Sequence, residues 1–373
     1  MLNNREAEAA RDEIYLYIGS YTKHSPTGIS IYAFNQHTGE LSYIDSVSGI
    51  ENPSYLVIHP VNRHLYAVSE IMETQGKQSG LVVAYAIDPR TGTLNQVNQQ
   101  LSEGSAPCYL SLDQQGRHVL VANFGGGTIT VLPLEGNGTL GQAICTVHHQ
   151  GSSIKPQQKA PHPHFIQYDP DHSFVFVADL GIDQVLLYRL EPSSRSLLLH
   201  GTVSLPAGAG PRHIAFHPER PYVYVINELD STIAAYSFSR EEGMLEAIQS
   251  ISTLPDDWEG RNDCADIHFS PCGRFLYGSN RGHDSIAVYR VDAATGRLAL
   301  LEHVITYGHK PRNFVIAPNG RFLLAANQGT DNIVTYQIDP QSGRLQKIGE
   351  LTGISQPVCL KLVETRMLAH EAG

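Results

Sequence analysis

The stretch that decides the fold spans residues 211–228 and reads Pro211-Arg-His-Ile-Ala-Phe-His-Pro-Glu-Arg-Pro-Tyr-Val-Tyr-Val-Ile-Asn-Glu228. Two segments rich in β-branched and aromatic residues flank a short turn that contains Pro, which predicts two antiparallel strands. The same frame begins again at Pro53, Pro107, Pro163, Cys264 and Pro311. A repeat of this kind predicts an array of similar β-units.

A second marker, a tight turn followed by Leu, lies between these frames. The seven Leu residues that end it are Leu41, Leu94, Leu140, Leu197, Leu245, Leu298 and Leu345. Together the two markers give four short strands for each repeat of roughly 50 residues, which is typical of a propeller blade. The sequence therefore predicts an all-β fold, a seven-bladed β-propeller with four-stranded antiparallel blades.

The seventh copy of the frame starts at Pro357 and contains only one strand, 358–363. Its missing partner is the apolar segment 14–20 at the other end of the chain. We therefore expect the N- and C-terminal strands to pair and close the ring, which removes exposed sheet edges. The predicted domain organisation is a flexible N-terminal tail 1–13, a single propeller 14–365 and a C-terminal tail 366–373.

Composition excludes several classes of protein. The 373 residues carry 26 Lys and Arg against 37 Asp and Glu, a net charge of −11, which argues against nucleic acid as a partner. No apolar run approaches the roughly 20 residues of a membrane helix, and no signal peptide is readable. Five Cys without a CxxC pair favour a reducing compartment, so we expect a cytoplasmic protein. The oligomeric state cannot be read from the sequence.

Propeller geometry predicts which polar side chains meet at the central channel. The start of each innermost strand and the end of the second strand share one face of an antiparallel blade. Counted from the anchor at the start of each frame, position +1 holds Ser54, Cys108, His164, Arg212, Ala265, Arg312 and Val358. Position +2 holds Tyr55, Tyr109, Phe165, His213, Asp266, Asn313 and Cys359, and position +17 holds Glu70, Phe124, Leu180, Glu228, Arg281 and Gln328.

Ionisable and amide side chains gather in only some of these blades. Blade stacking needs apolar faces and no such asymmetry, so the cluster is a candidate functional site, although structural ion pairs are the alternative. The long connections 71–80, 148–162 and 255–263 are expected on the same face, while the turns of the opposite face are expected to stay short.

Several motifs resemble those of the seven-bladed propeller lactonase family. They are Pro161-His-Pro-His164, Gly210-Pro-Arg-His213, Asn227-Glu-Leu229, Ala265-Asp-Ile-His268, Asn280-Arg281, Pro311-Arg-Asn-Phe314 and Asn327-Gln328. The best-known activity of this family is that of cytosolic 6-phosphogluconolactonase, and the family also includes a carboxy-muconate cyclase. The resemblance implies a metal-independent active site without a cofactor, with His164, Arg212, Glu228 and Arg281 as catalytic residues.

The expected substrate is therefore a small anionic lactone, 6-phospho-D-glucono-1,5-lactone of the pentose phosphate pathway, hydrolysed to 6-phosphogluconate. Glu228 or His164 would activate water, and Arg side chains would stabilise the oxyanion. The substrate-binding candidates are His213, Asp266, Arg312, Asn313, Gln328 and Glu70.

Three alternatives to this expectation stay open. The first is a lactonising cycloisomerase of the carboxy-muconate type or another sugar lactonase. The second is a non-enzymatic interaction platform. The third is a divalent metal held by His162, His164, Asp266 and Glu228.

Overall fold

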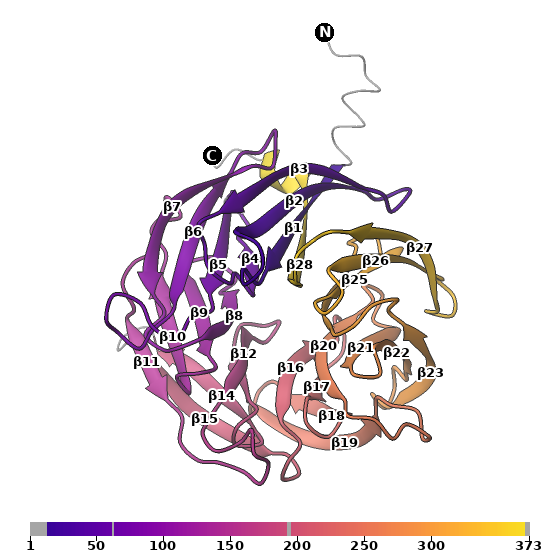
Figure 1. The fold of residues 1–373 in the computed structure, drawn as a ribbon. Coiled ribbons are helices and arrows are strands. Elements are labelled where there is room, and N and C mark those ends of the chain that lie inside the picture. The colour runs from indigo at the N-terminus through magenta and orange to yellow at the C-terminus, as the bar shows by residue number, and fades with distance from the viewer. Residues whose placement is uncertain (1–12, 62, 192–194, 370–373) are drawn as a thin grey trace.

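The computed structural model describes residues 13–61, 63–191 and 195–369, which form seven four-stranded antiparallel sheets. The sheets stand around a central axis like the blades of a propeller (Figure 1). This confirms the predicted all-β, seven-bladed architecture. The expected N-terminal tail lies outside the described residues, except for Glu13, which begins the first strand.

The blades follow the order of the chain, and each is written here from the centre outwards. Blade 1 consists of β28 (Pro357–Glu364), β1 (Glu13–Ser20), β2 (Thr27–Asn35) and β3 (Leu41–Ser48). Blade 2 consists of β4 (Leu56–Ile58), β5 (His64–Ser69), β6 (Leu81–Ile87) and β7 (Leu94–Leu101). Blade 3 consists of β8 (Pro107–Leu112), β9 (His118–Asn123), β10 (Thr128–Pro133) and β11 (Cys145–His148).

The remaining four blades are complete repeats along the chain. Blade 4 consists of β12 (Pro163–Tyr168), β13 (Val175–Asp179), β14 (Gln184–Glu191) and β15 (Ser196–Ser204). Blade 5 consists of β16 (Pro211–Phe216), β17 (Tyr222–Asn227), β18 (Thr232–Ser239) and β19 (Met244–Ser252). Blade 6 consists of β20 (Asp263–Phe269), β21 (Phe275–Arg281), β22 (Ser285–Val291) and β23 (Leu298–Ile305), and blade 7 of β24 (Pro311–Ile316), β25 (Phe322–Asn327), β26 (Asn332–Ile338) and β27 (Leu345–Thr352).

Burial falls from the centre of the ring to its rim. All six residues of β25 are buried, whereas partly buried and exposed residues alternate along β27. Inner strands are covered on both faces by neighbouring blades, and their sequences are therefore continuous apolar runs. Rim strands expose one face to solvent. The stacked faces of the blades thus form the hydrophobic core.

A repeated tyrosine contact joins neighbouring blades. The hydroxyl of Tyr224 in β17 donates to the carbonyl of Gly296 in the outer turn of blade 6 at 2.7 Å, and Tyr277 makes the same bond to Gly343 of blade 7 at 2.9 Å. Both glycines have positive φ, 70° and 71°, which a tight turn tolerates best at glycine. The turns that mark each repeat in the sequence are therefore also contacts between blades.

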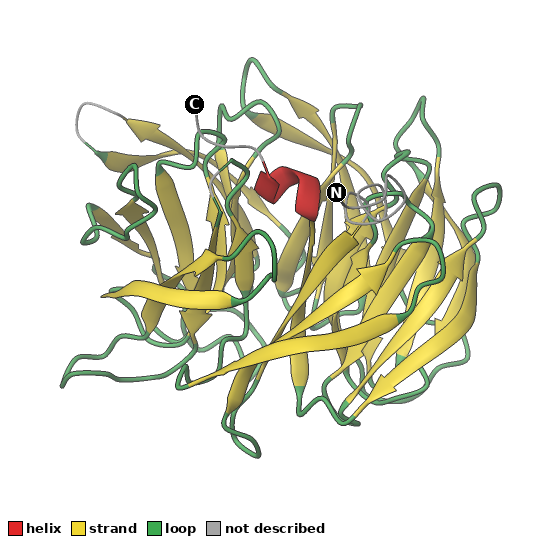
Figure 2. Cartoon of the chain, turned by 90° about the horizontal axis from the view of Figure 1, so that it is seen from above, coloured by secondary structure: helices red, strands yellow, loops and turns green. Residues whose placement is uncertain are grey.

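The ring closes between the two ends of the described chain. Strand β1 pairs antiparallel with β28 over seven residues, from Ile14 opposite Glu364 to Ser20 opposite Pro357, as predicted. The short helix α2 (Thr365–Ala369) follows β28 and is the one helix of the described residues (Figure 2). Leu368 of α2 is buried against the core, so folded structure continues past residue 365, where the sequence analysis placed the end of the propeller.

Loop lengths match the sequence prediction only in part. The connections 70–80, 149–162 and 253–262 lie at the end of the blades where the innermost strands begin. The turns of the opposite face are not all short, because residues 134–144 join β10 to β11 there. That prediction was wrong because β11 is only four residues long, which lengthens the preceding connection.

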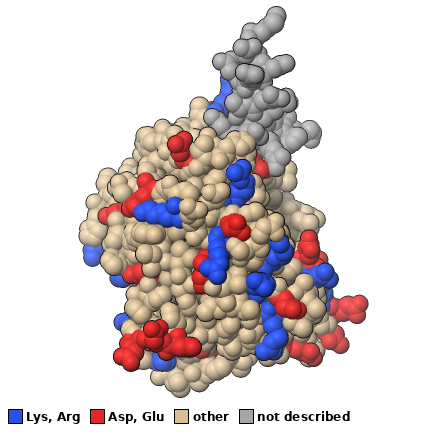
Figure 3. All heavy atoms as spheres, turned by 90° about the vertical axis from the view of Figure 1, so that its right-hand side faces the viewer, with Lys and Arg blue, Asp and Glu red and all other residues tan. Residues whose placement is uncertain are grey.

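The rim beside blades 6 and 7 mixes positive and negative side chains (Figure 3).

Candidate active site

A β-bulge in the innermost strand directs the candidate residues toward the channel. In β16, Pro211 and His213 both have partners on β17, so Arg212 is an extra residue between them. The same shift leaves His164 without a partner in β12 and Arg312 without one in β24. A bulge interrupts the alternation of side chains between the two faces of a strand and changes their direction. Side chains at positions +1 and +2 can therefore both lie at the central channel.

Arg212, Glu228 and Arg281 form one ion cluster. Nε of Arg212 and Nη2 of Arg281 each lie 2.9 Å from Oε2 of Glu228. Arg212 also donates from Nη1 to the backbone carbonyl of Ala265 at 2.5 Å, and Arg281 donates from Nη2 to that of Cys264 at 2.8 Å. Since both arginine contacts use Oε2, the other carboxylate oxygen of Glu228 is the one placed to meet a ligand.

The charges of this cluster follow from its surroundings. Burial alone would raise the pKa of Glu228, but Arg281, Arg212 and Arg312 together lower it below the ordinary value. Burial, aided by Arg281 and Arg312, lowers the pKa of Arg212 to about 10. The Glu228 carboxylate and the Arg212 guanidinium are therefore both ionised at neutral pH.

A second group joins Arg312 to Glu70 through a residue that sequence reasoning missed. The hydroxyl of Tyr21 donates to the carboxylate of Glu70, with oxygen distances of 3.2 and 3.0 Å, and the guanidinium of Arg312 lies 5.5 Å from the Tyr21 ring centre. Burial would lower the pKa of Arg312, but Tyr21, Glu70 and Glu228 raise it above its ordinary value. Tyr21 follows β1 and occupies position +17 of blade 1, which could have been found by extending the register across the ring closure.

His164 lies beside both groups as a buried neutral imidazole. Its ring packs edge-on against Phe124 and His213, with centroid distances of 5.5 and 5.3 Å. Burial, with the charges of Arg212 and Arg312, holds its pKa well below the ordinary value. Its Nδ1 is buried and has no hydrogen-bond partner among the described residues.

The position +2 side chains do not form the mouth of the site but a layer across the channel. All seven are at least nine-tenths buried: Tyr55, Tyr109, Phe165, His213, Asp266, Asn313 and Cys359. His213 Nδ1 lies 2.8 Å from Asp266 Oδ1, and the Asn313 amide donates to Asp266 Oδ2 at 2.5 Å. We call these seven side chains the channel layer.

The hydrogen bonds of the channel layer determine which ring nitrogen of His213 carries the proton. Burial and Arg212 lower the pKa of His213 to about 3, so the ring is neutral. Because Nδ1 faces the ionised Asp266, it carries the proton, and Nε2 accepts from Arg212 Nη1 at 3.2 Å. Asp266, His213 and Arg212 therefore form a chain of hydrogen bonds, and Arg212 is ion-paired with Glu228. Both carboxylate oxygens of Asp266 already accept hydrogen bonds from described residues.

A cavity with more cationic than anionic side chains, called here the basic cavity, opens next to the ion cluster. Its volume is about 560 Å³, and its lining includes Arg261, Arg281, Lys310, Arg312 and Gln328, together with the carboxylates of Asp263 and Asp284. Asp263 pairs with Arg261, and Asp284 contacts His309. The size is in the range of small-molecule sites, and four cationic side chains against two carboxylates favour an anionic ligand. Gln328, predicted at the channel mouth, is thus placed in this cavity together with Arg281 and Arg312.

The residues of the metal alternative do not come together. Within the part of the chain that the structure describes, no three His, Cys, Asp or Glu side chains are grouped to hold a metal ion. His162 Nδ1 contacts the Phe124 carbonyl at 2.8 Å, while Asp266 belongs to the channel layer. The structure thus gives no support to that alternative.

A seven-bladed propeller with arginine and glutamate side chains gathered at one mouth of its channel, beside a cavity with an excess of cationic side chains, is an enzyme-like scaffold. Comparison with known proteins makes this more specific. The family described as "Lactonase, 7-bladed beta-propeller" matches residues 15–362. The chain belongs to this family and is a lactone hydrolase.

Three relatives illustrate the similarity. The chain is 38% identical over 299 residues to a 6-phosphogluconolactonase of Bacillus subtilis (strain 168), covering 80% of this chain and 84% of the relative. It is 33% identical over 308 residues to a 6-phosphogluconolactonase of Formosa agariphila, covering 81% and 86%. The solved structure of a periplasmic gluconolactonase of Pseudomonas aeruginosa superposes with a TM-score of 0.89 at 32% identity, covering 94% and 99%.

Among the described residues, no helix has the length and apolarity to cross a membrane, and one relative is named as periplasmic. The cytoplasmic location therefore stays a prediction.

Proposed function

We propose that the chain hydrolyses 6-phospho-D-glucono-1,5-lactone to 6-phosphogluconate. The observation that carries this proposal is the position of the Arg212–Glu228–Arg281 cluster beside a cavity that contains three more cationic side chains. The cluster supplies groups for ester hydrolysis, and the additional cations supply a place for a phosphate. Relatives named 6-phosphogluconolactonase support the same substrate.

The reaction needs a water molecule, a proton acceptor and stabilisation of an oxyanion. Water attacks the lactone carbonyl carbon, the carbonyl oxygen becomes an oxyanion, and the bond from this carbon to the ring oxygen then breaks. Arg281, whose side chain is only partly buried and lines the cavity, stabilises the oxyanion. The proton of the water passes to Nδ1 of His164 and finally to the departing ring oxygen.

Glu228 is assigned mainly to orientation. Its Oε2 is held between two guanidinium groups, which fixes the geometry of the carboxylate. Its unpaired oxygen holds a hydrogen of the attacking water, while the contacts through Oε2 keep Arg212 and Arg281 in place.

Arg312 and Lys310 are assigned to the phosphate of the substrate, and Gln328 to its hydroxyl groups, because all three line the same cavity. Glu70 acts on Arg312 through Tyr21. His213, Asp266 and Asn313, first expected to touch the substrate, are positioning residues in this proposal, since their polar atoms are engaged within the channel layer.

The test compares the rate of opening of freshly prepared 6-phosphogluconolactone with and without the purified protein. Glucono-1,5-lactone and a carboxy-muconate substrate are run in parallel, each with and without EDTA. We expect the phosphorylated lactone to have the highest kcat/KM, unchanged by EDTA. Preference for the muconate would support the cycloisomerase alternative, and no activity on any substrate would support the interaction platform.

A further inference from the structure

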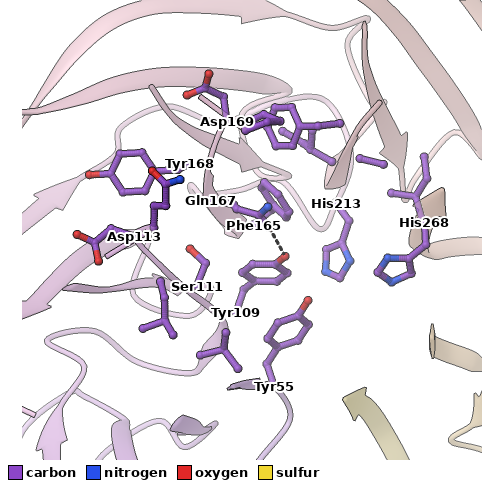
Figure 4. A pocket seen from close by; sticks show the side chains of 18 of the residues that line it. Tyr55, Tyr109, Ser111, Asp113, Phe165, Gln167, Tyr168, Asp169, His213 and His268 are labelled. Carbon is purple, nitrogen blue, oxygen red and sulfur yellow. Dashed lines mark hydrogen bonds between the residues drawn. The ribbon is translucent and has the colours of Figure 1, made fainter. Parts of the chain in front are cut away.

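A second cavity, of about 660 Å³, opens at the opposite end of the central channel (Figure 4). It is formed by the C-terminal ends of β4, β8, β12, β16 and β20, whereas the candidate active site lies at the N-terminal ends of the innermost strands. We call this cavity the distal cup. Five side chains two residues beyond the channel layer line it: Val57, Ser111, Gln167, Ala215 and His268.

The channel layer separates the distal cup from the active site. Tyr55 and Tyr109 stack with ring centres 4.0 Å apart, and Phe165 lies 4.7 Å beyond Tyr109. His213 closes against Tyr109 at 5.2 Å and is bound to Asp266 on its other side. These side chains form the floor of the cup, so the cup is a site of its own and not the back of the basic cavity.

The charge of the distal cup is opposite in character to that of the basic cavity. Among the described residues its lining includes no Lys or Arg, and the neighbouring Lys361 is held over the Tyr55 ring at 4.4 Å. Of the three carboxylates in its wall, Asp113 is bound by two backbone N–H groups and His118, and Asp266 by the channel layer. The third, Asp169, accepts two backbone N–H groups through Oδ1 only. Such a wall disfavours an anion and can accept hydrogen bonds from hydroxyl groups.

The cup also holds polar atoms that lack a partner. Ser111 Oγ and Asp169 Oδ2 are buried without a hydrogen bond among the described residues. Gln167 accepts from the Tyr109 hydroxyl through Oε1 at 3.3 Å, which leaves its amide N–H groups as donors, and His268 uses Nε2 for Asp266, which leaves Nδ1. Buried polar groups are rarely left unpaired, so a ligand that brings several hydroxyl groups would satisfy this wall.

We propose that the distal cup binds a small, uncharged, polyhydroxylated ring, of the class of neutral monosaccharides. The hydroxyl groups of such a ring pair with the Gln167 amide and the His268 ring, and its C–H face packs on the aromatic floor. The volume lies within the range of small-molecule sites. This proposal is independent of the reaction assigned to the other mouth of the channel.

The test measures binding of methyl β-D-glucopyranoside to the full chain by ligand-observed NMR and by calorimetry. Ala215→Phe places a ring inside the cup, and Gln167→Leu removes its amide donors. We expect binding to be lost in the first variant and about tenfold weaker in the second. Arg312→Ala, in the basic cavity, is the matched control and should bind the sugar as the parent does.

Melting temperatures show which variants are folded, and Gln167→Leu decides the question if Ala215→Phe does not fold. The proposal is overturned if the glucoside shows no saturable binding to the parent. It is also overturned if binding survives both cup variants, if Arg312→Ala abolishes it, or if sodium gluconate or adenine occupies the cup in its place.

Discussion

Oε2 of Glu228 lies 2.9 Å from Nε of Arg212, although the two residues are 16 positions apart in the sequence. Arg212 is the bulged residue at the start of β16, and Glu228 directly follows β17 of the same blade. Arg281 of the next blade reaches the same oxygen. The ion cluster therefore depends on the pairing of β16 with β17 and on the packing of blade 5 against blade 6.

Glu228→Gln tests the role of the carboxylate. The substitution keeps the shape but leaves Arg212 and Arg281 facing a neutral group, and we expect kcat to fall about 100- to 1000-fold with a small change in KM. The measurement is steady-state hydrolysis of the phosphorylated lactone, with the melting temperature as a check of folding. A folded variant with the kcat of the parent would show that the cluster is structural only.

Arg312→Ala tests the phosphate contact. Loss of one charge-assisted contact costs about 2–3 kcal/mol, so kcat/KM for the phosphorylated lactone should fall roughly 30- to 150-fold, mainly through KM. Glucono-1,5-lactone lacks the phosphate and should be affected little. Arg297→Ala, on an exposed turn, is the control. Equal losses for both lactones would remove Arg312 from the phosphate site.

Acid stability should depend on the buried histidines. Burial, with Arg212, lowers the pKa of His213 to about 3 from an ordinary 6.5, and that of His164 also falls well below 6.5. Below pH 6.5 the unfolded chain binds protons that the folded chain does not, so the free energy of unfolding falls as pH decreases, by about 1.4 kcal/mol per pH unit for each such histidine. Above pH 6.5 this contribution is constant.

His164→Asn removes one of these titrating groups. Urea unfolding of parent and variant between pH 7 and pH 5 should show a shallower loss of stability in the variant, whatever its stability at pH 7. Parallel curves for the two proteins would mean that His164 takes up a proton in the folded state.

Ring closure can be tested by removing residues 357–373. The deletion removes β28 and exposes the edge of β1 over the seven residues that now pair, so we expect aggregation and a lower melting temperature. Lys361→Ala changes one partly buried side chain of β28 and serves as the control. A truncated chain that stays monomeric with the melting temperature of the parent would refute the closure.

The fold could be predicted from the sequence because its repeat is regular. The turn before each outer strand and the apolar pairs such as 211–228 recur from blade to blade, because each blade uses them for the same packing. The length of the connection 134–144 was not predictable in this way, since it depends on how late the chain enters β11, the outer strand of blade 3.

The site was harder to predict, because side chains do not alternate regularly between the two faces of a strand at a bulge. The register placed Arg212, Glu228 and Arg281 together, and the structure brings them into contact. It also put His213 and Asp266 at the mouth, whereas the bulge leaves +1 side chains in the site and +2 side chains across the channel. Hydrogen bonds between different blades, such as the one from His213 to Asp266, leave no pattern in a single sequence.

Tyr21→Phe tests the residue that the sequence register missed. The change removes the hydroxyl that donates to Glu70 but keeps the ring beside Arg312. Without this hydrogen bond the Glu70 carboxylate is less firmly placed, and the field that favours the charged Arg312 is weaker. We expect KM for the phosphorylated lactone to rise about three- to tenfold, the effect of roughly one lost hydrogen bond, with kcat nearly unchanged. Tyr222→Phe, which removes a hydroxyl bonded at an exposed turn, is the matched control. If Tyr21→Phe lowers kcat for both phosphorylated and unphosphorylated lactones, Tyr21 acts on the reacting carbonyl and not through Arg312.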